Sequence, residues 1–230
     1  MPAPTIDQLT LADEPARWEA LGFDVAEDSC QIGTVRLRFS EPPADPGQPG
    51  IVGWSLRDLA SGALSPEGEL DGLPTTLSYA PISPPATVHP NGVVSIDHLV
   101  AASPDLDRSV ASLQAAGLDL RRVREEPTPA GAPRQAFFRL GREILELIQE
   151  PEPMVASSPE GQRAGGRDHP ARFWGIALVV ADLDSTVERL AGHVSPARAA
   201  VQAGRRIATV RRSAGLAVPL ALMSAEQQVG

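Results

Sequence analysis

His98 and Glu146 are the residues whose types and positions first indicate chemistry. His98 lies in the segment VVSIDHLVA and Glu146 in EILELIQ, and both segments have the apolar, β-branched pattern of strands. In EILELIQ a period of two puts Ile144, Glu146 and Ile148 on one face. A carboxylate between isoleucines is costly to bury unless it is paired, metal-bound or at a cleft wall. We expect Glu146 to face a cleft, with a salt bridge or a surface position as the alternative. His98 is either a ligand or a hydrogen-bonded core residue.

The elements around these residues follow the order strand, helix and three strands. Val93–Ala101 is the predicted first strand, and the segment SPDLD that starts at Ser103 caps a helix over 106–116, which stops at Gly117. Further strands are predicted over 118–123, 134–140 and 143–149.

Parts of this pattern recur along the chain. The segments IDQLTLAD, IDHLVAASPDLD and WGIALVVADLD resemble one another as first strands, and QIGTVRLR, QAFFRLGR and RIATVRRS as later ones. Between them, ALGF, AAGL and LAGH stand at similar helix ends. Because three elements recur three times in the same order, we expect duplicated βαβ-type modules. IVGWSLRDLASG is a candidate for the remnant of a fourth first strand.

The N-terminal copy and the connections are less regular. Strands are expected over 5–11 and 31–39, with Asp13 capping a short helix between them. The proline- and glycine-rich stretches 81–92 and 151–170 are expected to be linkers.

Composition excludes several classes of function. The net charge is −9, which disfavours binding to nucleic acid and to anionic membranes. All 20 basic residues are Arg, so a lysine Schiff base is impossible. Cys30 is the only cysteine, which excludes an internal disulfide and a cysteine zinc site, and we expect it to be buried. The N-terminus does not read as a signal peptide and apolar runs are short, so a cytoplasmic protein is expected.

The repeated pattern resembles the vicinal-oxygen-chelate superfamily, the glyoxalase/bleomycin-resistance/dioxygenase group, best over residues 93–224. The resemblance implies an α+β fold of repeated βαβββ modules that form cupped mixed sheets, with shortened N-terminal modules. It also implies that the chain has two parts. Residues 1–88 would hold degenerate modules and a linker, and residues 89–230 a glyoxalase-like domain with modules at 93–150 and 171–226.

Metal-binding members of this superfamily carry ligands on the first and last strands of each module. The resemblance places His98 and Glu146 at such positions, and Gln8 at the His98 position of the first module. If the first module pairs with the module at 93–150, which is the third when IVGWSLRDLASG is counted as a module, these three residues would converge on Zn, Ni, Mn or Fe. The last module has Gly175 at the His98 position, and Pro219, Leu220 or Ala221 where the carboxylate is expected.

Other residues are candidates for substrate binding. Arg134 and Arg205 could hold an anionic group bidentately, with charge balance on an acidic protein as the alternative. Trp174 could line an apolar pocket, as could Trp54, although core packing is the default for both. No phosphate-binding glycine loop or nucleotide fingerprint is present, so no nucleotide cofactor is expected. Of the other histidines, His169 and His193 are expected to be structural or exposed. His89 lies in the proline-rich crossing and could reach the mouth of the cup, although nothing in the sequence requires it.

Two functions remain open. The first is a glyoxalase-like enzyme that uses a metal as Lewis acid and Glu146 as ligand or base, in isomerase-, lyase- or epimerase-type chemistry. The second is a non-catalytic protein that sequesters a drug or metabolite in the same fold. In both cases the partner is a small molecule, and the resemblance implies a possible homodimer.

Overall fold

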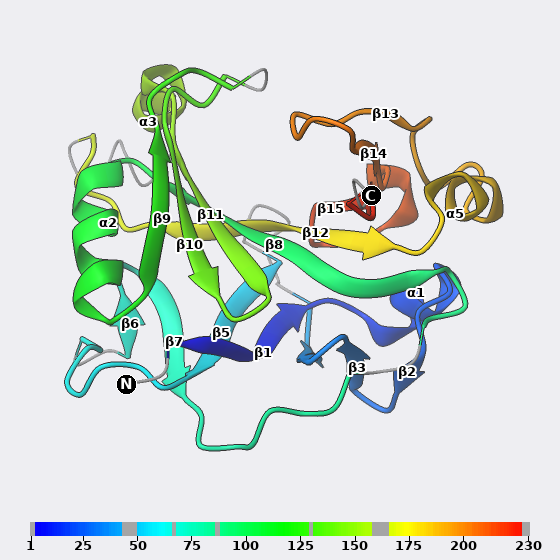
Figure 1. The fold of residues 1–230 in the computed structure, drawn as a ribbon, viewed down its shortest axis with the longest axis horizontal. Helices are drawn as coiled ribbons and strands as arrows, with labels where there is room; N and C mark the ends of the chain where they lie inside the picture. The colour runs from blue at the N-terminus through cyan, green and yellow to red at the C-terminus, as the bar shows by residue number, and fades with distance from the viewer. Residues whose placement is uncertain are drawn as a thin grey trace. The chain divides into compact units, whose positions relative to one another are not determined.

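A computed structural model describes residues 3–42, 50–65, 68–85, 88–128, 131–157 and 166–226, without the side chains of residues 156 and 157. The proline-rich stretch 41–50 and the expected linker 151–170 therefore lie partly outside the described residues. In chain order the elements are β1 (Thr5–Ala12), α1 (Pro15–Ala20), β2 (Val25–Ala26), β3 (Ser29–Ile32), β4 (Val35–Ser40), β5 (Ile51–Arg57), β6 (Glu69–Leu70), β7 (Leu73–Leu77), β8 (Val93–Ser103), α2 (Leu106–Ala115), β9 (Asp119–Arg124), β10 (Gln135–Leu140), β11 (Glu143–Gln149), α3 (Glu152–Ser157), β12 (Arg172–Val180), α5 (Leu183–Arg189), β13 (Arg198–Ala199), β14 (Arg206–Thr209), a 3₁₀ turn at Arg212–Ala214, and β15 (Leu220–Ser224) (Figure 1).

These strands form two mixed sheets, which confirms the expected α+β fold of repeated modules. The eight-stranded sheet has the order β13-β14-β15-β12-β8-β11-β10-β9, so two copies of one pattern meet at β12 and β8. In each copy the first strand lies next to the last, followed by the third and the second. The seven-stranded sheet, β2-β3-β4-β1-β5-β7-β6, repeats the pattern in shortened form, with β5 as a first strand. Between β5 and β6, the described residues contain no helix.

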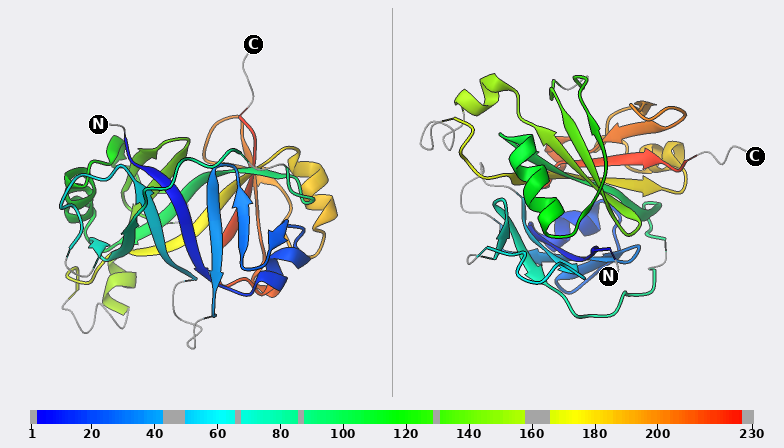
Figure 2. Two further views of the ribbon diagram at one scale, coloured as in Figure 1. Left: turned by 90° about the horizontal axis from the view of Figure 1, so that it is seen from below. Right: turned by 60° about the vertical axis from the view of Figure 1, so that its left-hand side comes forward.

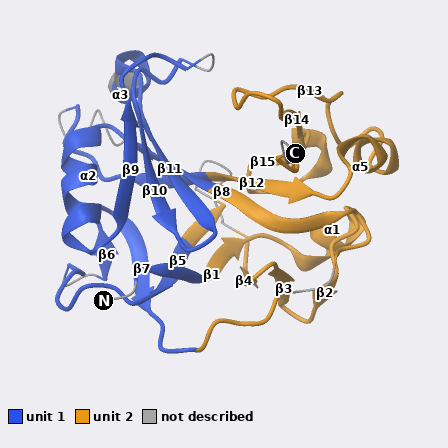
Figure 3. Cartoon of the chain, in the orientation of Figure 1, with its two compact units in different colours: residues 1–7, 53–80, 99–174 blue, residues 8–52, 81–98, 175–230 orange. Residues whose placement is uncertain are grey.

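The chain divides into two compact units that interleave along the sequence. Unit 1 comprises residues 1–7, 53–80 and 99–174, and unit 2 comprises residues 8–52, 81–98 and 175–230 (Figure 3). The division passes through the first strands β1, β5, β8 and β12. Each unit is therefore described by itself.

In unit 1, helix α2 packs against one face of the antiparallel strands β9, β10 and β11 (Figure 1; Figure 2 gives two further views). The apolar side chains of this layer are fully buried, namely Leu106, Leu113, Phe138, Leu145 and Leu147. The Asp105 carboxylate caps α2 by accepting from the backbone N–H of Arg108 at 3.1 Å. The left-handed Gly117 ends the turn that follows the helix, as its sequence pattern predicts.

In unit 2, the core forms around Trp18 of α1. Its ring packs on Phe23 and Phe39 at centroid distances of 4.9 and 5.5 Å. Its indole N–H donates to Asp13 at 3.1 Å, and Asp13 also accepts from the backbone of Ala217. The prediction that Asp13 caps α1 is wrong, because Glu14 occupies the cap position without a side-chain hydrogen bond.

Two other expectations need correction. The single strand expected over 31–39 is a hairpin of β3 and β4, because Gly33 adopts a left-handed conformation (φ 56°) and reverses the chain. The expected linker after β11 contains the helix α3, in which Val155 is buried. None of the described helices combines the length and the apolar character needed to cross a membrane.

Candidate functional site

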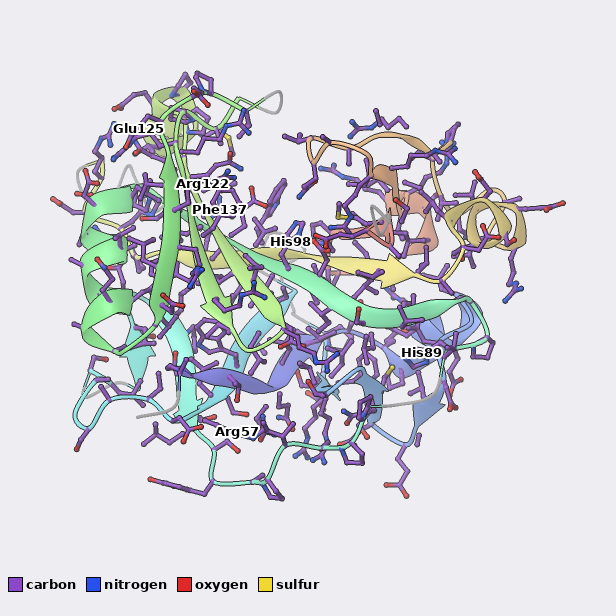
Figure 4. The ribbon with its side chains drawn as sticks, in the orientation of Figure 1. Arg57, His89, His98, Arg122, Glu125 and Phe137 are labelled. Atoms are coloured by element: carbon purple, nitrogen blue, oxygen red, sulfur yellow. The ribbon has the colours of Figure 1, made fainter. Side chains whose placement is uncertain are left out.

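Glu146 lies in unit 1, in a row of three side chains that crosses three strands. On β10, Phe137 pairs with Glu146 of β11 on one side and with Arg122 of β9 on the other. Paired residues of neighbouring strands point to the same face of a sheet. The Arg122 guanidinium lies over the Phe137 ring, 5.0 Å from its centroid (Figure 4). The row therefore brings a cation, an aromatic ring and a carboxylate together.

The alternation along β11 separates this face from the core. Leu145 and Leu147 are fully buried under α2, whereas Ile144, Glu146 and Ile148 are half-buried. This is the face that the period of two in the sequence assigns to Glu146. The carboxylate is therefore not sealed in the apolar layer beneath the helix.

The orientation of the Glu146 carboxylate is set by Gln135. The Gln135 side-chain amide nitrogen donates to Oε1 of Glu146, and Gln135 is almost fully buried. Its own carbonyl oxygen has no hydrogen-bond partner among the described residues. A buried amide that donates to a carboxylate holds the carboxylate in one rotamer, so Gln135 acts as a positioning residue for Glu146.

His98 lies in unit 2, where it forms a chain of contacts with Asp97 and Arg205. Its Nδ1 lies 2.7 Å from one carboxylate oxygen of Asp97, and Nη1 of Arg205 lies 2.6 Å from the other. Arg205 is buried, and its Nε donates to the backbone carbonyl of Ser224 at 3.0 Å. With Nδ1–H donated to Asp97, a neutral His98 carries its lone pair on Nε2, which suits a metal ligand or a base.

The electrostatics of Asp97 support this arrangement. Burial would raise the pKa of Asp97, but the hydrogen bonds and charges of His98 and Arg205 outweigh burial and lower the pKa. Asp97 is therefore ionised at neutral pH and accepts from both neighbours. An ionised partner on Nδ1 fixes the orientation and the tautomer of the His98 ring.

Gln8, the third expected metal ligand, lies in a different sheet from His98 and Glu146. Gln8 lies on β1, in the seven-stranded sheet between β4 and β5, while β8 with His98 lies in the other sheet beside β12. The sheets therefore do not pair the first and third modules edge to edge. The Gln8 amide is 3.5 Å from the Thr10 hydroxyl. Within the described part of the chain, no three or more His, Cys, Asp or Glu residues form a metal-binding group.

Gly175 shows why the last module carries no ligand at the matching position. A Cβ atom at residue 175 would lie 2.8 Å from the carbonyl oxygen of Pro219 and 3.3 Å from its Cβ. The first of these contacts is with backbone, and β12 binds the same carbonyl through the N–H of Ile176 at 3.0 Å. A histidine at residue 175 therefore does not fit without moving β15.

The residues expected to bind substrate have varied surroundings. The Arg134 guanidinium is paired with Glu125 at 2.6 Å and with Asp107 at 3.0 Å, which raises its pKa above the ordinary value. Trp174 is 47% exposed and lies outside the core, so core packing, its default role, is excluded. Trp54 is buried and donates to the Thr75 hydroxyl at 2.7 Å, in line with its default. Substrate binding by Arg134, Arg205 and Trp174 stays a prediction.

The other three histidines and Cys30 differ in their surroundings. His89 accepts from the backbone N–H of Asp24 at Nδ1 and contacts the Gln31 carbonyl at Nε2. His169 is buried beside Glu150, at 3.5 Å, and His193 is exposed. Cys30 is buried, and burial, with a smaller effect from Asp24, raises the pKa of its thiol to about 12.

A surface hollow follows the end of β9. It is lined by Arg122, Val123, Arg124, Glu125 and Glu126. Figure 4 shows Arg122 beside Phe137, with Glu125 beyond the end of the strand. The hollow therefore includes the cationic end of the row that contains Glu146.

Most of the sequence that forms the eight-stranded sheet matches a known family. The description of that family is glyoxalase/bleomycin resistance protein/dioxygenase superfamily, and the match covers residues 97–209. This part of the chain belongs to that superfamily. The matched segment contains the residues described above, namely Asp97, His98, Arg122, Gln135, Phe137, Glu146 and Arg205. Ser224, whose carbonyl accepts from Arg205, lies outside it.

Several solved structures resemble the chain at low identity. A methylmalonyl-CoA epimerase from Mycobacterium tuberculosis is 20% identical over 60% of this chain and 92% of its own, with a TM-score of 0.45. A Streptomyces coelicolor methylmalonyl-CoA epimerase in complex with 2-nitronate-propionyl-CoA is 21% identical over 58% and 98%, with a TM-score of 0.43. A hypothetical protein from Bacillus halodurans C-125 is 16% identical over 59% and 97%, also with 0.43. Among curated proteins, no match was found.

Sequence reasoning missed four residues of this superfamily segment that contact or align with the candidates. Asp97 was adjacent to His98 in the sequence, but nothing there connected it to Arg205. Gln135, Phe137 and Arg122 meet Glu146 only through the cross-strand register. A hairpin alignment of QAFFRL with EILELI would have paired Phe137 with Glu146, whereas the β-bulge between β9 and β10 hides the pairing with Arg122.

Proposed function

We propose that the protein is a glyoxalase-like enzyme that moves a proton on a small molecule, in isomerase- or lyase-type chemistry. The observation that carries the proposal is the Glu146 carboxylate, fixed by the Gln135 amide on the face that also presents Phe137 and Arg122. A carboxylate held in one orientation beside an aromatic surface suits a general base toward a carbon acid. Membership of the superfamily supports the same class of reaction.

His98 supports the proposal from unit 2. Because Asp97 holds its Nδ1, the Nε2 nitrogen is the one that would bind a metal or exchange a proton. Imidazole nitrogen and carboxylate oxygen are donors that Zn, Ni, Mn and Fe accept. Gln8, His98 and Glu146 remain the proposed ligands, and a bound divalent metal would act as a Lewis acid that stabilises negative charge on substrate oxygens.

A sequestering protein of the same fold is the second candidate. Its support is Gly175, where the packing of Pro219 excludes a ligand side chain, together with the exposed indole of Trp174. An exposed aromatic side chain suits stacking on a flat drug or metabolite. A homodimer and a cytoplasmic location stay predictions.

Titration with Zn²⁺, Ni²⁺, Mn²⁺ and anaerobic Fe²⁺ by calorimetry distinguishes the two candidates. The enzyme proposal expects one metal per chain, with affinity lowered at least about tenfold by His98→Ala and by Glu146→Ala. His193→Ala is the matched control, because His193 is exposed, and it should bind metal as the unchanged protein does. Absence of stoichiometric binding, or equal affinity in all variants, would contradict a metal-assisted enzyme and favour sequestration.

A further inference from the structure

The Arg122 guanidinium differs from the other arginines considered above. Arg134 is paired with Glu125 and Asp107, and Arg205 with Asp97. Among the residues that the structure describes, no carboxylate pairs with Arg122, whose guanidinium instead lies over the Phe137 ring. Arg122 can therefore bind an anion, whereas Arg134 and Arg205 already pair with carboxylates of the protein.

The Arg122 side chain is exposed although its guanidinium lies over the Phe137 ring. The attraction of a cation to a ring face uses no N–H bond as a hydrogen-bond donor, so the five N–H bonds of the guanidinium can donate to a ligand. Two parallel N–H bonds match the two oxygens of a carboxylate. The β-bulge between β9 and β10, at which Phe137 pairs with Arg122 and Phe138 with Leu120, brings Arg122 into line with Phe137.

The row also has the dimensions of a small ligand. Neighbouring strands lie about 4.8 Å apart, so the backbones of Arg122 and Glu146 are separated by about 10 Å, with Phe137 between them. Both side chains extend from the same face. One small molecule can therefore meet the guanidinium with an anionic group and the Glu146 carboxylate with a C–H group.

Charge explains why such a molecule needs Arg122. The protein has a net charge of −9, and Glu146 adds a negative charge in the row itself. A carboxylate ligand beside Glu146 is repelled unless a cation compensates it. The hollow at the end of β9 includes Arg122, which gives the anionic group access from solvent.

From these contacts we infer that the ligand of this face is a small carboxylate with a flat apolar body. Arg122 binds its carboxylate bidentately, Phe137 packs against the apolar body, and Glu146 faces its C–H group. The inference deepens the proposed function and rests on it for the role of Glu146, whereas the role of Arg122 in binding can be tested separately.

The test uses 4-fluorobenzoate and the neutral 4-fluorobenzamide as probes, followed by ¹⁹F NMR titration. Saturable binding of the benzoate is expected, with the benzamide at least about tenfold weaker. Arg122→Gln should remove this preference. Arg122→Lys should weaken benzoate binding less than Arg122→Gln does, because lysine keeps the positive charge but lacks the planar pair of N–H donors. No saturable binding of benzoate, or equal binding of both probes, would overturn the inference.

Arg121→Gln is the matched control. Arg121 is adjacent on the same strand, is mostly exposed and pairs with Asp119 at 3.1 Å. It should bind benzoate as the unchanged protein does, and equal losses in the Arg121 and Arg122 variants would overturn the inference. Thermal unfolding of each variant checks that it is folded.

Glu146→Gln separates this inference from the proposed function. Because it removes the like charge, it should bind benzoate several-fold more tightly while losing proton transfer. Arg122-dependent benzoate binding without any Glu146-dependent reaction would leave the binding site standing and remove the enzyme. A Glu146-dependent reaction without Arg122-dependent binding would remove only the carboxylate inference.

Discussion

Arg205 holds Asp97 from the far end of the superfamily segment, with Nη1 of Arg205 2.6 Å from Oδ1 of Asp97. The other oxygen of Asp97 contacts His98 at 2.7 Å. The last module, which has Gly175 at the position that matches His98, thus contributes the arginine that supports the histidine of the module before it. The orientation of His98 depends on both modules.

Replacing Arg205 should therefore be costly. In Arg205→Met the Asp97 carboxylate loses its buried cation, and we expect unfolding free energy to fall by about 3 kcal/mol. Urea denaturation of the variant measures the loss. Arg206→Met is the control, because Arg206 is an adjacent, exposed arginine whose pair with Asp184 is also exposed, and it should unfold as the unchanged protein does. Equal stability of the two variants would show that the Asp97–Arg205 pair does not support the fold.

His89 should make the protein less stable in mild acid. Its burial lowers the pKa of the imidazole, and Nδ1 accepts a backbone N–H, which an imidazolium cannot do. With the folded pKa below the unfolded one, the unfolded chain binds more protons as pH falls below about 6.5, so stability decreases there. One such proton gives a slope of at most about 1.4 kcal/mol per pH unit.

Urea denaturation between pH 7.5 and 5 measures this slope in the unchanged protein, in His89→Gln and in His193→Gln. His89→Gln should be less stable overall but flatter with pH, and His193→Gln should keep the slope of the unchanged protein. A slope that survives in His89→Gln would assign the proton to another group.

Gly175 should tolerate no side chain. Gly175→Ala places a Cβ within 2.8 Å of the Pro219 carbonyl, so we expect a loss of roughly 1–3 kcal/mol in unfolding free energy. Gly204→Ala is the comparison, because nothing lies within 4 Å of a Cβ there and only its left-handed backbone is strained, so the loss should be smaller. An unchanged stability in Gly175→Ala would mean that β15 moves easily and that a ligand could be restored at residue 175.

Local patterns predicted the elements of the best-preserved module well. The alternation in EILELIQ and the pattern SPDLD before an apolar helix are properties of neighbouring residues, and they correctly located β11 and α2. The hairpin at Gly33 and the buried role of Asp13 were missed, because they depend on a turn conformation and on Ala217, which is distant in the sequence. The site shows the same division, since Asp97 meets Arg205, and Glu146 meets Gln135, only through contacts that the folded chain creates.

Deuterium incorporation from D₂O tests the central claim, that Glu146 is the base of a proton-transfer enzyme, most directly. The unchanged protein, supplied with divalent metal, is incubated with 2-oxo acids, 2-hydroxy ketones and acyl thioesters, and loss of the acidic C–H signal is followed by ¹H NMR. We predict catalysed exchange that falls at least about 100-fold in Glu146→Gln and is retained in Glu126→Gln, whose carboxylate is 79% exposed outside the row. Equal exchange rates with and without the Glu146 carboxylate, or no catalysed exchange in any compound class, would contradict the account.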